Sequence, residues 1–393
     1  MCAVVASKVT HKRPADHVAD VAVLGNGPAG AAACAALGRL GVRPVWVLPG
    51  NAAPPALGET LSVAGIDLMR RLDAGHLLEA PGHRPENVMF SAWGTGQLIE
   101  RHAIRHPLGA GKVLDRARFN ESLGALAASH ARALHTPCTG FSAGAGGWQL
   151  MLADGGQVRA RFVIDATGRR AFLGRRLGVL RRLDSLVAVT ATLAGVPRHI
   201  EPTPATLIES ASSGWWYATL LPGRRVSLMY FTDADLLPFR VRHAPEKLLA
   251  LLAETRHVSR WLDDLALDAP KALSLHACGT AWLVSPASVS CNTPGWAAVG
   301  DAALALDPLS SHGISSALWA AHRVAEGVVQ WLDGRHDDLA GYVEAIQHGR
   351  QRYLEERRSM YGREKRFPDA IFWRRRGFSL PECELKHAET TNG

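Results

Sequence analysis

Short apolar runs alternate with helical patterns along the chain, and this order predicts an α/β fold. Residues 20–24 (DVAVL) and 45–48 (VWVL) are rich in β-branched residues and typical of buried parallel strands. Residues 31–40 between them are rich in Ala and Leu and predict a helix. A strand–helix–strand unit of this kind is typical of a Rossmann-type domain. Residues 1–18 are polar, and we expect them to be disordered.

The patterns continue to the end of the chain. Helical spacing predicts helices in residues 59–80 and 114–133, the second capped by Asp115. Residues 161–165 (RFVID) and 295–300 (GWAAVG) predict two more buried strands.

Alternating runs in residues 186–232 are typical of an antiparallel sheet, and they lie between two Rossmann-like segments. Helical patterns follow in residues 245–262 and 315–331 and in the tail from Leu339. We therefore predict an α/β protein with a discontinuous Rossmann-type dinucleotide domain and an antiparallel β-sheet substrate domain of α+β type. The predicted parts are 20–180 (with substrate-domain strands near 86–106), 181–275 for the substrate sheet, 276–338 for the second dinucleotide part, and 339–393 for a helical C-terminal region.

The turn after the first strand has the sequence GNGPAG, residues 25–30. Gly25 permits the tight turn, Gly27 lets the backbone approach a pyrophosphate, and Gly30 lets the helix pack closely on the strand. The N–H groups at the helix start favour a phosphate. The motif predicts dinucleotide contacts at Gly25, Gly27, Pro28, Ala29 and Gly30.

The end of the second strand departs from the usual NAD pattern. Dinucleotide folds often place an acidic residue there to bind the ribose, whereas this chain has Leu48 and Pro49. The sequence therefore predicts a dinucleotide without assigning NAD.

Two later segments also combine a strand with a turn, namely RFVIDATGRRA at 161–171 and GWAAVGDAALALDPLSSHGISSAL at 295–318. Asp301 follows its strand and is suited to accept a hydrogen bond from a ribityl hydroxyl. The stretch DPLSSHGI opens a helix, whose N-terminus favours the negative charge of reduced flavin. From these segments we predict cofactor contacts at Asp165, Gly168, Gly300, Asp301, Pro308, Gly313 and Ile314.

Together the three segments resemble the FAD-binding elements of flavoprotein monooxygenases of the aromatic hydroxylase fold. Further stretches resemble a smaller branch, which contains flavin-dependent halogenases and the flavoproteins that mature tryptophylquinone cofactors. The latter modify tryptophan residues in the precursors of lysine oxidase, glycine oxidase and quinohemoprotein amine dehydrogenase. The stretches are GET at 58–60, SAWG at 91–94, LDRARF at 114–119, GWWY at 214–217 and FPDAIFWRRR at 367–376.

Three departures separate the chain from the halogenases it resembles. Tryptophan halogenases carry a Lys downstream of the Gly-Glu motif, which guides hypohalous acid to the substrate, but no Lys lies between Glu59 and Trp93. They also carry a Glu-Ser pair, where this chain has Ser310 and Ser311, and a WxWxIP motif, which GWWYATLLP replaces. These departures favour hydroxylation or oxidation of an aromatic ring.

The resemblance implies an FAD-dependent monooxygenase that acts through a C4a-hydroperoxyflavin. It favours Glu59 as a group near the flavin ring, and His312, beside the predicted flavin N1 site, is a candidate proton donor. Arg116 either binds FAD or is a surface helix residue, and both interpretations stay open. The candidate substrate-pocket residues are Trp93, Trp216 and Tyr217, although neighbours on a strand face opposite sides, so one of the adjacent pair belongs to the core.

Composition sets limits on the partners. The net charge of +8 attracts anions, but an Arg-rich composition alone accounts for it, so we predict no nucleic-acid partner. Six scattered Cys without CxxC spacing predict no metal site. The uncharged stretch 21–38 contains Pro28 and several Gly, so we predict no membrane span. The N-terminus has Lys and Arg but no apolar run before the first strand, so we predict no signal peptide and a cytoplasmic protein. The Arg run 374–376 either docks an acidic partner or forms a solvated helix face.

The resemblance points to a tryptophan residue of a precursor protein or peptide as the substrate. A small-molecule aromatic hydroxylase or halogenase of secondary metabolism is the alternative enzyme, and a flavin-binding assembly chaperone is an alternative of another class. The chain has no second dinucleotide motif. We therefore expect NAD(P)H, bound transiently, or a separate flavin reductase to supply electrons, and the oligomeric state stays open.

Overall fold

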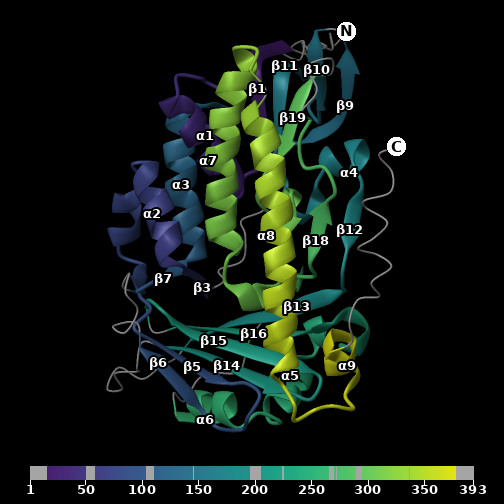
Figure 1. The fold of residues 1–393 in the computed structure, drawn as a ribbon. Helices are drawn as coiled ribbons and strands as arrows, with labels where there is room; N and C mark the ends of the chain where they lie inside the picture. Colours follow the sequence, from purple (N-terminus) through teal and green to yellow (C-terminus); the bar gives the residue numbers. More distant parts are fainter. Residues whose placement is uncertain are drawn as a thin grey trace, which may run out of the picture.

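The computed structural model describes residues 16–49, 58–102, 110–144, 146–194, 205–223, 225–264, 270, 272–288, 294–335 and 337–377. Two seven-stranded sheets dominate the molecule, one in the upper half of Figure 1 and one in the lower half. Figure 1 also shows helix α8 (Asp337–Gly362) extending along both halves.

The first sheet is the predicted Rossmann-type sheet. Four parallel strands run in the order β8 (Arg132–Leu134), β2 (Val45–Val47), β1 (Asp16–Leu24) and β11 (Gln157–Asp165), and β19 (Gly295–Ala298) pairs in parallel with the second half of β11. An antiparallel hairpin of β9 (Cys138–Gly144) and β10 (Gly147–Leu152) extends the first half of β11. The expectation of disorder was wrong for residues 16–18, because they pair with β11 as part of β1; residues 1–15 lie outside the described chain.

Helices cover one face of this sheet. They are α1 (Pro28–Arg39), α3 (Arg116–His130) and α7 (Gly313–Leu332), and their apolar side chains form one core with those of β1, β11 and β19. The other face packs against residues 171–173, which precede α4 (Gly174–Leu177), and against side chains of β12 (Leu180–Arg182) and β18 (Ala281–Leu283). Strand β18 also pairs with β20 (Leu304–Ala305), which completes a three-stranded sheet. Asp115 caps the start of α3 as predicted, because its side chain accepts a hydrogen bond from the N–H of Arg118 at 3.3 Å.

A small antiparallel sheet lies between the two large ones in Figure 1. Its strands are β3 (Gly58–Leu61), β7 (Lys112–Asp115) and β4 (His83–Pro85). The prediction of one helix over 59–80 was therefore wrong at its start, because residues 58–61 pair with β7. Ser62 then caps α2 (Val63–Arg71), and a 3₁₀ turn, η1 (Gly75–Glu79), follows.

The second large sheet is antiparallel except for one parallel pair, β14 with β5. Its order is β17 (Ser274–Ala277), β13 (Leu186–Leu193), β16 (Arg225–Asp233), β15 (Gly214–Leu221), β14 (Ala205–Ala211), β5 (Val88–Ala92) and β6 (Ile99–His102). Helices α5 (Pro245–Leu252) and α6 (His257–Asp264) cover one face. The opposite face packs against the end of α8 and against α9 (Ile371–Gly377).

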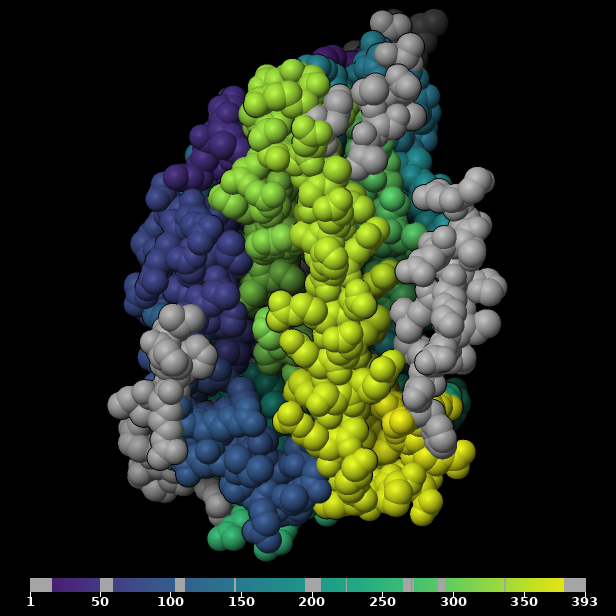
Figure 2. Space-filling view, in the orientation of Figure 1, coloured from purple at the N-terminus to yellow at the C-terminus, as the bar shows by residue number. Residues whose placement is uncertain are grey.

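The C-terminal helices join the two halves of the molecule. Figure 2 shows α8 as a continuous ridge that runs from beside α7 to the large sheet. Three-residue 3₁₀ turns, η4 (Ala234–Leu236) and η5 (Val241–His243), connect the large sheet to α5. No helix within the described ranges is long and apolar enough to cross a bilayer.

Candidate cofactor and substrate site

The glycine-rich turn lies where β1 ends and α1 begins. Gly25 has φ of +116°, and a Cβ there would lie 2.2 Å from the carbonyl oxygen of Ala166. A Cβ on Gly30 would lie 2.2 Å from the carbonyl oxygen of Gly25. Packing within the protein therefore requires both glycines, the first against the end of β11 and the second against the turn itself.

Gly27 differs from these two glycines because nothing in the protein lies within 4 Å of a Cβ built on it. It caps α1, whose first residue is Pro28, and Ala29 is buried behind it. No internal contact requires a glycine at this position, whereas a phosphate close to the backbone would. The space at Gly27 therefore fits the predicted pyrophosphate, as does the similarly free space at Gly168 and Gly313.

Trp46 holds the turn in place, and sequence reasoning missed this role. Its indole N–H donates to the carbonyl oxygen of Gly25 at 2.8 Å, and the N–H of Gly25 donates to Val47 at 3.0 Å. Trp46 is buried on β2. The only signal in the sequence was an indole, which needs a hydrogen-bond acceptor, inside an otherwise apolar strand.

Four charged side chains from separate segments gather beside this turn. Asp301 forms an ion pair with Arg169 at 3.2 Å, and Arg116 forms one with Glu59. Burial raises the pKa of Asp301, while Arg169 and Arg116 act in the opposite sense. Burial lowers the pKa of Arg116 to about 10, and its Nε is buried without a hydrogen-bond partner among the described residues.

This group of charges fits the polar part of a dinucleotide. The side chain of Asp301 is 34% exposed and can accept a hydrogen bond from a hydroxyl group. The unpaired Nε of Arg116 can donate a hydrogen bond to an anionic oxygen. Arg169 is fixed by the carbonyl oxygens of Gly279 and, at 2.8 Å, Leu306. Glu59 orients Arg116, and a catalytic role for Glu59 stays a prediction.

Asp165 has a structural role, which corrects the prediction that it contacts the cofactor. Its side chain has no solvent exposure, and both oxygens are occupied by donors from the following turn. The donors are the N–H and hydroxyl of Thr167 and the N–H groups of Leu173 and Gly174, at 2.6–3.0 Å. Asp165 thereby shapes the turn that carries Gly168, the first residue of η3 (Gly168–Arg170).

The segment from Gly300 to α7 is held from two sides. Gly300 begins η6 (Gly300–Ala302) with φ of +59°, and a Cβ on it would lie 2.9 Å from that of Ala29. Farther along, Asp307 caps η7 (Pro308–Ser310) through the N–H of Leu309 at 3.0 Å. The segment thus lies directly against the start of α1.

Helix α8 fixes the same segment through three residues spaced one turn apart. Tyr361 donates to Oδ2 of Asp307 at 2.8 Å, and Nε of Arg357 lies 3.3 Å from the same oxygen. Tyr353 accepts from the N–H of Asp307 at 2.7 Å. Asp307 is itself buried. Sequence analysis predicted the helix but not this contact, because a spacing of four residues has no special signature within a helix rich in Arg and Tyr.

His312 is exposed in front of α7, and its ring forms no hydrogen bond within the described part of the chain. Gly313 is exposed beside it, and Ile314 is buried in the helical core. The predicted proton donor therefore lies at the free N-terminus of α7, and its catalytic role stays a prediction.

Trp216 and Tyr217 are neighbours on β15, and their side chains point to opposite faces of the sheet, as expected for consecutive strand residues. Trp216 has no solvent exposure and packs beneath α5 and α6, so the prediction that it lines the substrate pocket was wrong. Tyr217 faces the opposite side, is half-buried, and lies 3.5 Å from the hydroxyl of Thr60 on β3. Leu309 of the predicted flavin-binding segment contributes to the same apolar cluster as Tyr217.

Trp93 docks the C-terminal segment and belongs to the same apolar cluster as Tyr217, so its role in the substrate pocket stays a prediction. Its indole donates to the carbonyl oxygen of Met360 at 2.8 Å. Its ring packs edge-on against Trp215, Tyr361 and Trp373, at 5.3–6.1 Å between ring centroids.

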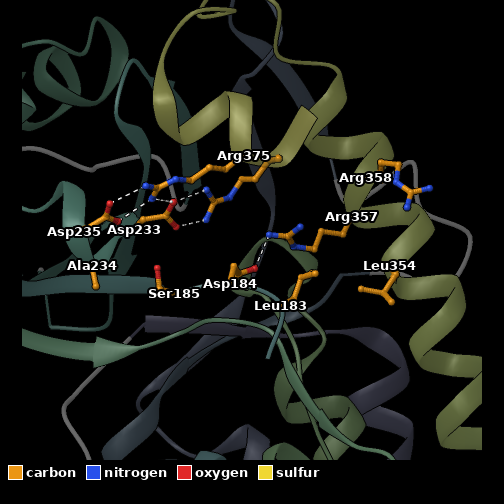
Figure 3. A pocket seen from close by; sticks show the side chains of 11 residues that line it. Leu183, Asp184, Ser185, Asp233, Ala234, Asp235, Leu354, Arg357, Arg358 and Arg375 are labelled. Carbon is orange, nitrogen blue, oxygen red and sulfur yellow. Dashed lines mark hydrogen bonds and ion pairs between the residues drawn. The ribbon is translucent and has the colours of Figure 1, made fainter. Parts of the chain in front are cut away.

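The Arg-rich tail makes internal ion pairs, which neither reading of the tail foresaw. Arg375 and Arg376 bind Asp233 at 2.9 and 2.6 Å, and Arg375 also binds Asp235 at 2.7 Å. These residues line a cavity of about 700 Å³, and Figure 3 shows Arg375 with Asp233 and Asp235 on one side of it and Arg357 with Asp184 on the other. These arginines already pair with carboxylates of the protein. We therefore interpret the cavity as a space left where α8, α9 and the large sheet meet.

A carboxyl that the sequence did not single out lies near Tyr217. Glu86 follows β4, and the hydroxyl of Thr60 donates to its Oε1 at 2.9 Å. Burial raises the pKa of Glu86, and hydrogen bonds from Thr60 and Thr206 only partly offset this. The pKa of Tyr217 is raised to about 12, mainly by burial and also by Glu86.

The described chain offers no group of three or more side chains suited to a metal ion. Its described cysteines, Cys34, Cys138 and Cys278, are free thiols.

Comparison with known proteins extends these observations. The family model described as tryptophan halogenase matches residues 114–386. LodB of Marinomonas mediterranea, whose name describes an FAD-dependent oxidoreductase, is 29% identical over 388 residues, which cover 94% of this chain and 99% of that protein.

Two solved structures illustrate the shared fold. QhpG, a peptidyl tryptophan dihydroxylase essential for tryptophylquinone cofactor biogenesis, has a TM-score of 0.74 and 24% identity, with coverage of 92% of this chain and 79% of that chain. The myxobacterial chondrochloren halogenase CndH has a TM-score of 0.82 and 19% identity, with coverage of 95% and 89%. The predicted fold class is thereby confirmed. The chain belongs to the tryptophan halogenase family, and it is an FAD-dependent oxidoreductase.

Proposed function

We propose that the protein is a monooxygenase that hydroxylates an aromatic ring, and that the ring belongs to a tryptophan residue of a precursor polypeptide. The overall reaction is balanced when the substrate, dioxygen, NAD(P)H and a proton give the hydroxylated substrate, water and NAD(P)⁺. Bound FAD would carry the two electrons to dioxygen. Because the chain has no second dinucleotide motif, the electrons come from transiently bound NAD(P)H or from a separate flavin reductase.

Hydroxylation is favoured over halogenation because the ionisable group beside Tyr217 is a carboxyl and not an ammonium group. The stretch from Glu59 to Trp93 contains no Lys, and its titratable group next to Tyr217 and Thr60 is the partly buried carboxyl of Glu86. An ammonium group binds and polarises a hypohalous acid, whereas a carboxyl repels anions and accepts protons. The Glu-Ser pair implied for halogenases is also absent, since these residues are Ser310 and Ser311.

The relatives support a polypeptide substrate. QhpG, which shares the fold, acts on a peptidyl tryptophan according to its description, and LodB matches this chain along nearly its full length. A small-molecule aromatic hydroxylase is the second candidate, favoured by the apolar cluster that Tyr217 and Leu309 share. A flavin-binding assembly chaperone would need no substrate-dependent consumption of dioxygen.

The protein's own residues have separable tasks in this reaction. Arg116 and Asp301 would hold the polar part of FAD, with Glu59 and Arg169 keeping them in place. The apolar side chains around Leu309 and Tyr217 would exclude water from the ring.

The test supplies the FAD-loaded protein with a flavin reductase, NADH, dioxygen and an excess of chloride and bromide. The substrates are tryptophan-containing peptides and free tryptophan, and products are identified by mass spectrometry. We expect products that gain oxygen and none that gain halogen. A halogenated product would overturn the proposal, and consumption of dioxygen that no aromatic substrate alters would favour the chaperone.

A further inference from the structure

Glu86 is partly buried, and among the described residues its carboxyl lacks the charged or backbone N–H partners that the other acids discussed here have. Among the described residues its carboxyl has only hydroxyl partners, at Thr60 and Thr206. Arg84, two residues earlier, forms no ion pair with any described residue. A carboxylate without a cation or a backbone N–H donor is costly to bury, so packing alone does not account for it.

The contrast with neighbouring acids is direct. Glu209 accepts three backbone N–H groups at the start of α6, at 2.8–2.9 Å. Glu364 is bound by Arg366 and by the N–H of Gly94, and Asp115 is bound by Arg225. These carboxylates accept from cations or backbone N–H groups, whereas the described donors to Glu86 are hydroxyl groups alone.

Strand geometry places Glu86 on the side of β3 opposite the charges assigned to the dinucleotide. Glu59 and Thr60 are consecutive, and while Glu59 turns to Arg116 beside Asp301, Thr60 turns to Glu86 and Tyr217. One strand therefore separates the dinucleotide contacts from the Glu86 group. Tyr217 in turn shares its apolar cluster with Leu309 of the predicted flavin-binding segment.

We propose that Glu86 is the general base that accepts the proton from the aromatic ring during hydroxylation, an inference that rests on the proposed function. In this substitution the ring carbon forms a bond to one oxygen atom of dioxygen, and its C–H bond breaks. The electron pair of that bond returns to the ring, and the proton passes to the carboxylate of Glu86. The proton then leaves with the second oxygen atom, which becomes water with the two electrons of NAD(P)H.

Thr60 and Tyr217 are positioning residues for this base. Thr60 holds Oε1 of Glu86 at 2.9 Å, and the phenol of Tyr217 is the titratable group that faces the carboxyl from the large sheet. From the small sheet the charged neighbours are Arg84, which does not pair with Glu86, and Lys112, which pairs with Glu79.

The experiment compares Glu86→Gln, Glu86→Asp and the control Glu100→Gln, whose carboxyl is exposed on β6. We expect Glu86→Gln to bind FAD normally and to consume NADH and dioxygen, while hydroxylated product falls about a hundredfold or more and hydrogen peroxide accumulates. Glu86→Asp should regain part of the product with a shifted pH profile. Wild-type product formation by Glu86→Gln would overturn the proposal.

A second readout does not depend on turnover. Burial holds the pKa of Glu86 above its ordinary value of 4.5, so the wild type loses stability as pH rises through the pKa of the folded state. We expect Glu86→Gln to have the higher melting temperature at neutral pH, with the difference vanishing below the ordinary value. A melting temperature lowered by the substitution at all pH values would show a structural role and overturn the proposal. If this pH dependence is found but the wild type hydroxylates no aromatic substrate, the proposed function fails and the assignment of a base fails with it, while the uncompensated carboxyl is established.

Discussion

The hydroxyl of Tyr361, near the end of α8, donates a hydrogen bond of 2.8 Å to Oδ2 of Asp307, which caps the turn before α7. The two residues are 54 positions apart in the sequence. Tyr353 and Arg357 on the same helix bind the same aspartate. The C-terminal helix therefore fixes the segment that we assign to the flavin, which gives it a role beyond covering the fold.

We predict that Tyr361→Phe loosens this segment. The substitution removes a donor from a buried carboxylate, which costs about 1–3 kcal/mol of stability, and FAD should dissociate faster. The matched control is Tyr230→Phe, because Tyr230 is also buried but bonds Ser213 at 2.7 Å, away from the segment. Thermal unfolding and the rate of FAD loss in the two variants check this. Equal FAD retention in both would contradict the assigned role of Tyr361.

Gly27→Val should abolish FAD binding without unfolding the protein. A Cβ at Gly27 meets no protein atom within 4 Å, so the side chain occupies only the space assigned to the pyrophosphate. Gly30→Val provides the contrast, since its Cβ would collide with Gly25, and it should lower the melting temperature. Full FAD occupancy in Gly27→Val, measured from flavin absorbance, would show that the first motif is misassigned.

Asp301→Ala should weaken FAD binding by about 1.5–3 kcal/mol, the value of a hydrogen bond to a charged group, or roughly ten- to a hundredfold. The carboxylate is 34% exposed and is suited to accept a hydrogen bond from a ribityl hydroxyl, and its removal also takes away the ion-pair partner of Arg169. Titration of the apoprotein with FAD measures the change. An unaltered dissociation constant would mean that Asp301 does not contact the cofactor.

The docking of the C-terminal segment should be sensitive to acid. Burial raises the pKa of Glu364, but hydrogen bonds from Arg366, Ser210 and backbone N–H groups outweigh it and set the value at about 2. Because the folded-state pKa is depressed, Glu364 contributes stability above its ordinary value of 4.5, and this contribution is lost as pH falls towards 2.

Glu364→Gln should therefore be less stable than the wild type at neutral pH, with a difference that shrinks to nothing in strong acid. The fluorescence of Trp93 and Trp373, which lie in this segment's docking cluster, reports the transition. A stability difference that does not depend on pH would rule out the ionised carboxylate as its source.

Local signals predicted the parts of the fold that rest on short-range rules. The apolar runs before Gly25 and Asp301 are strands, and Asp115 caps α3 as its sequence context indicates. Residues 58–61 were misjudged because their apolar spacing fits a helix, while pairing with β7, some 50 residues later, decides for a strand.

The roles of single side chains were harder to predict, because they depend on distant partners. Trp216 and Tyr217 differ only by strand parity, and the layer of α5 and α6 decides which of them is core. Asp165 resembles a ligand-binding acid in the sequence, but in the structure it accepts hydrogen bonds from the N–H groups of Leu173 and Gly174. Nothing near Glu86 in the sequence marks it, since Thr60 and Tyr217 come from other strands.

The most direct test of the central claim is mass spectrometry of a tryptophan-containing precursor polypeptide, incubated with the FAD-loaded protein, a flavin reductase, NADH and isotopically heavy dioxygen. The account predicts that the precursor gains heavy oxygen on a tryptophan side chain, and that the gain requires the protein, dioxygen and reductant together. If free tryptophan or another small aromatic is hydroxylated efficiently while no precursor gains oxygen, the claim of a polypeptide substrate is contradicted.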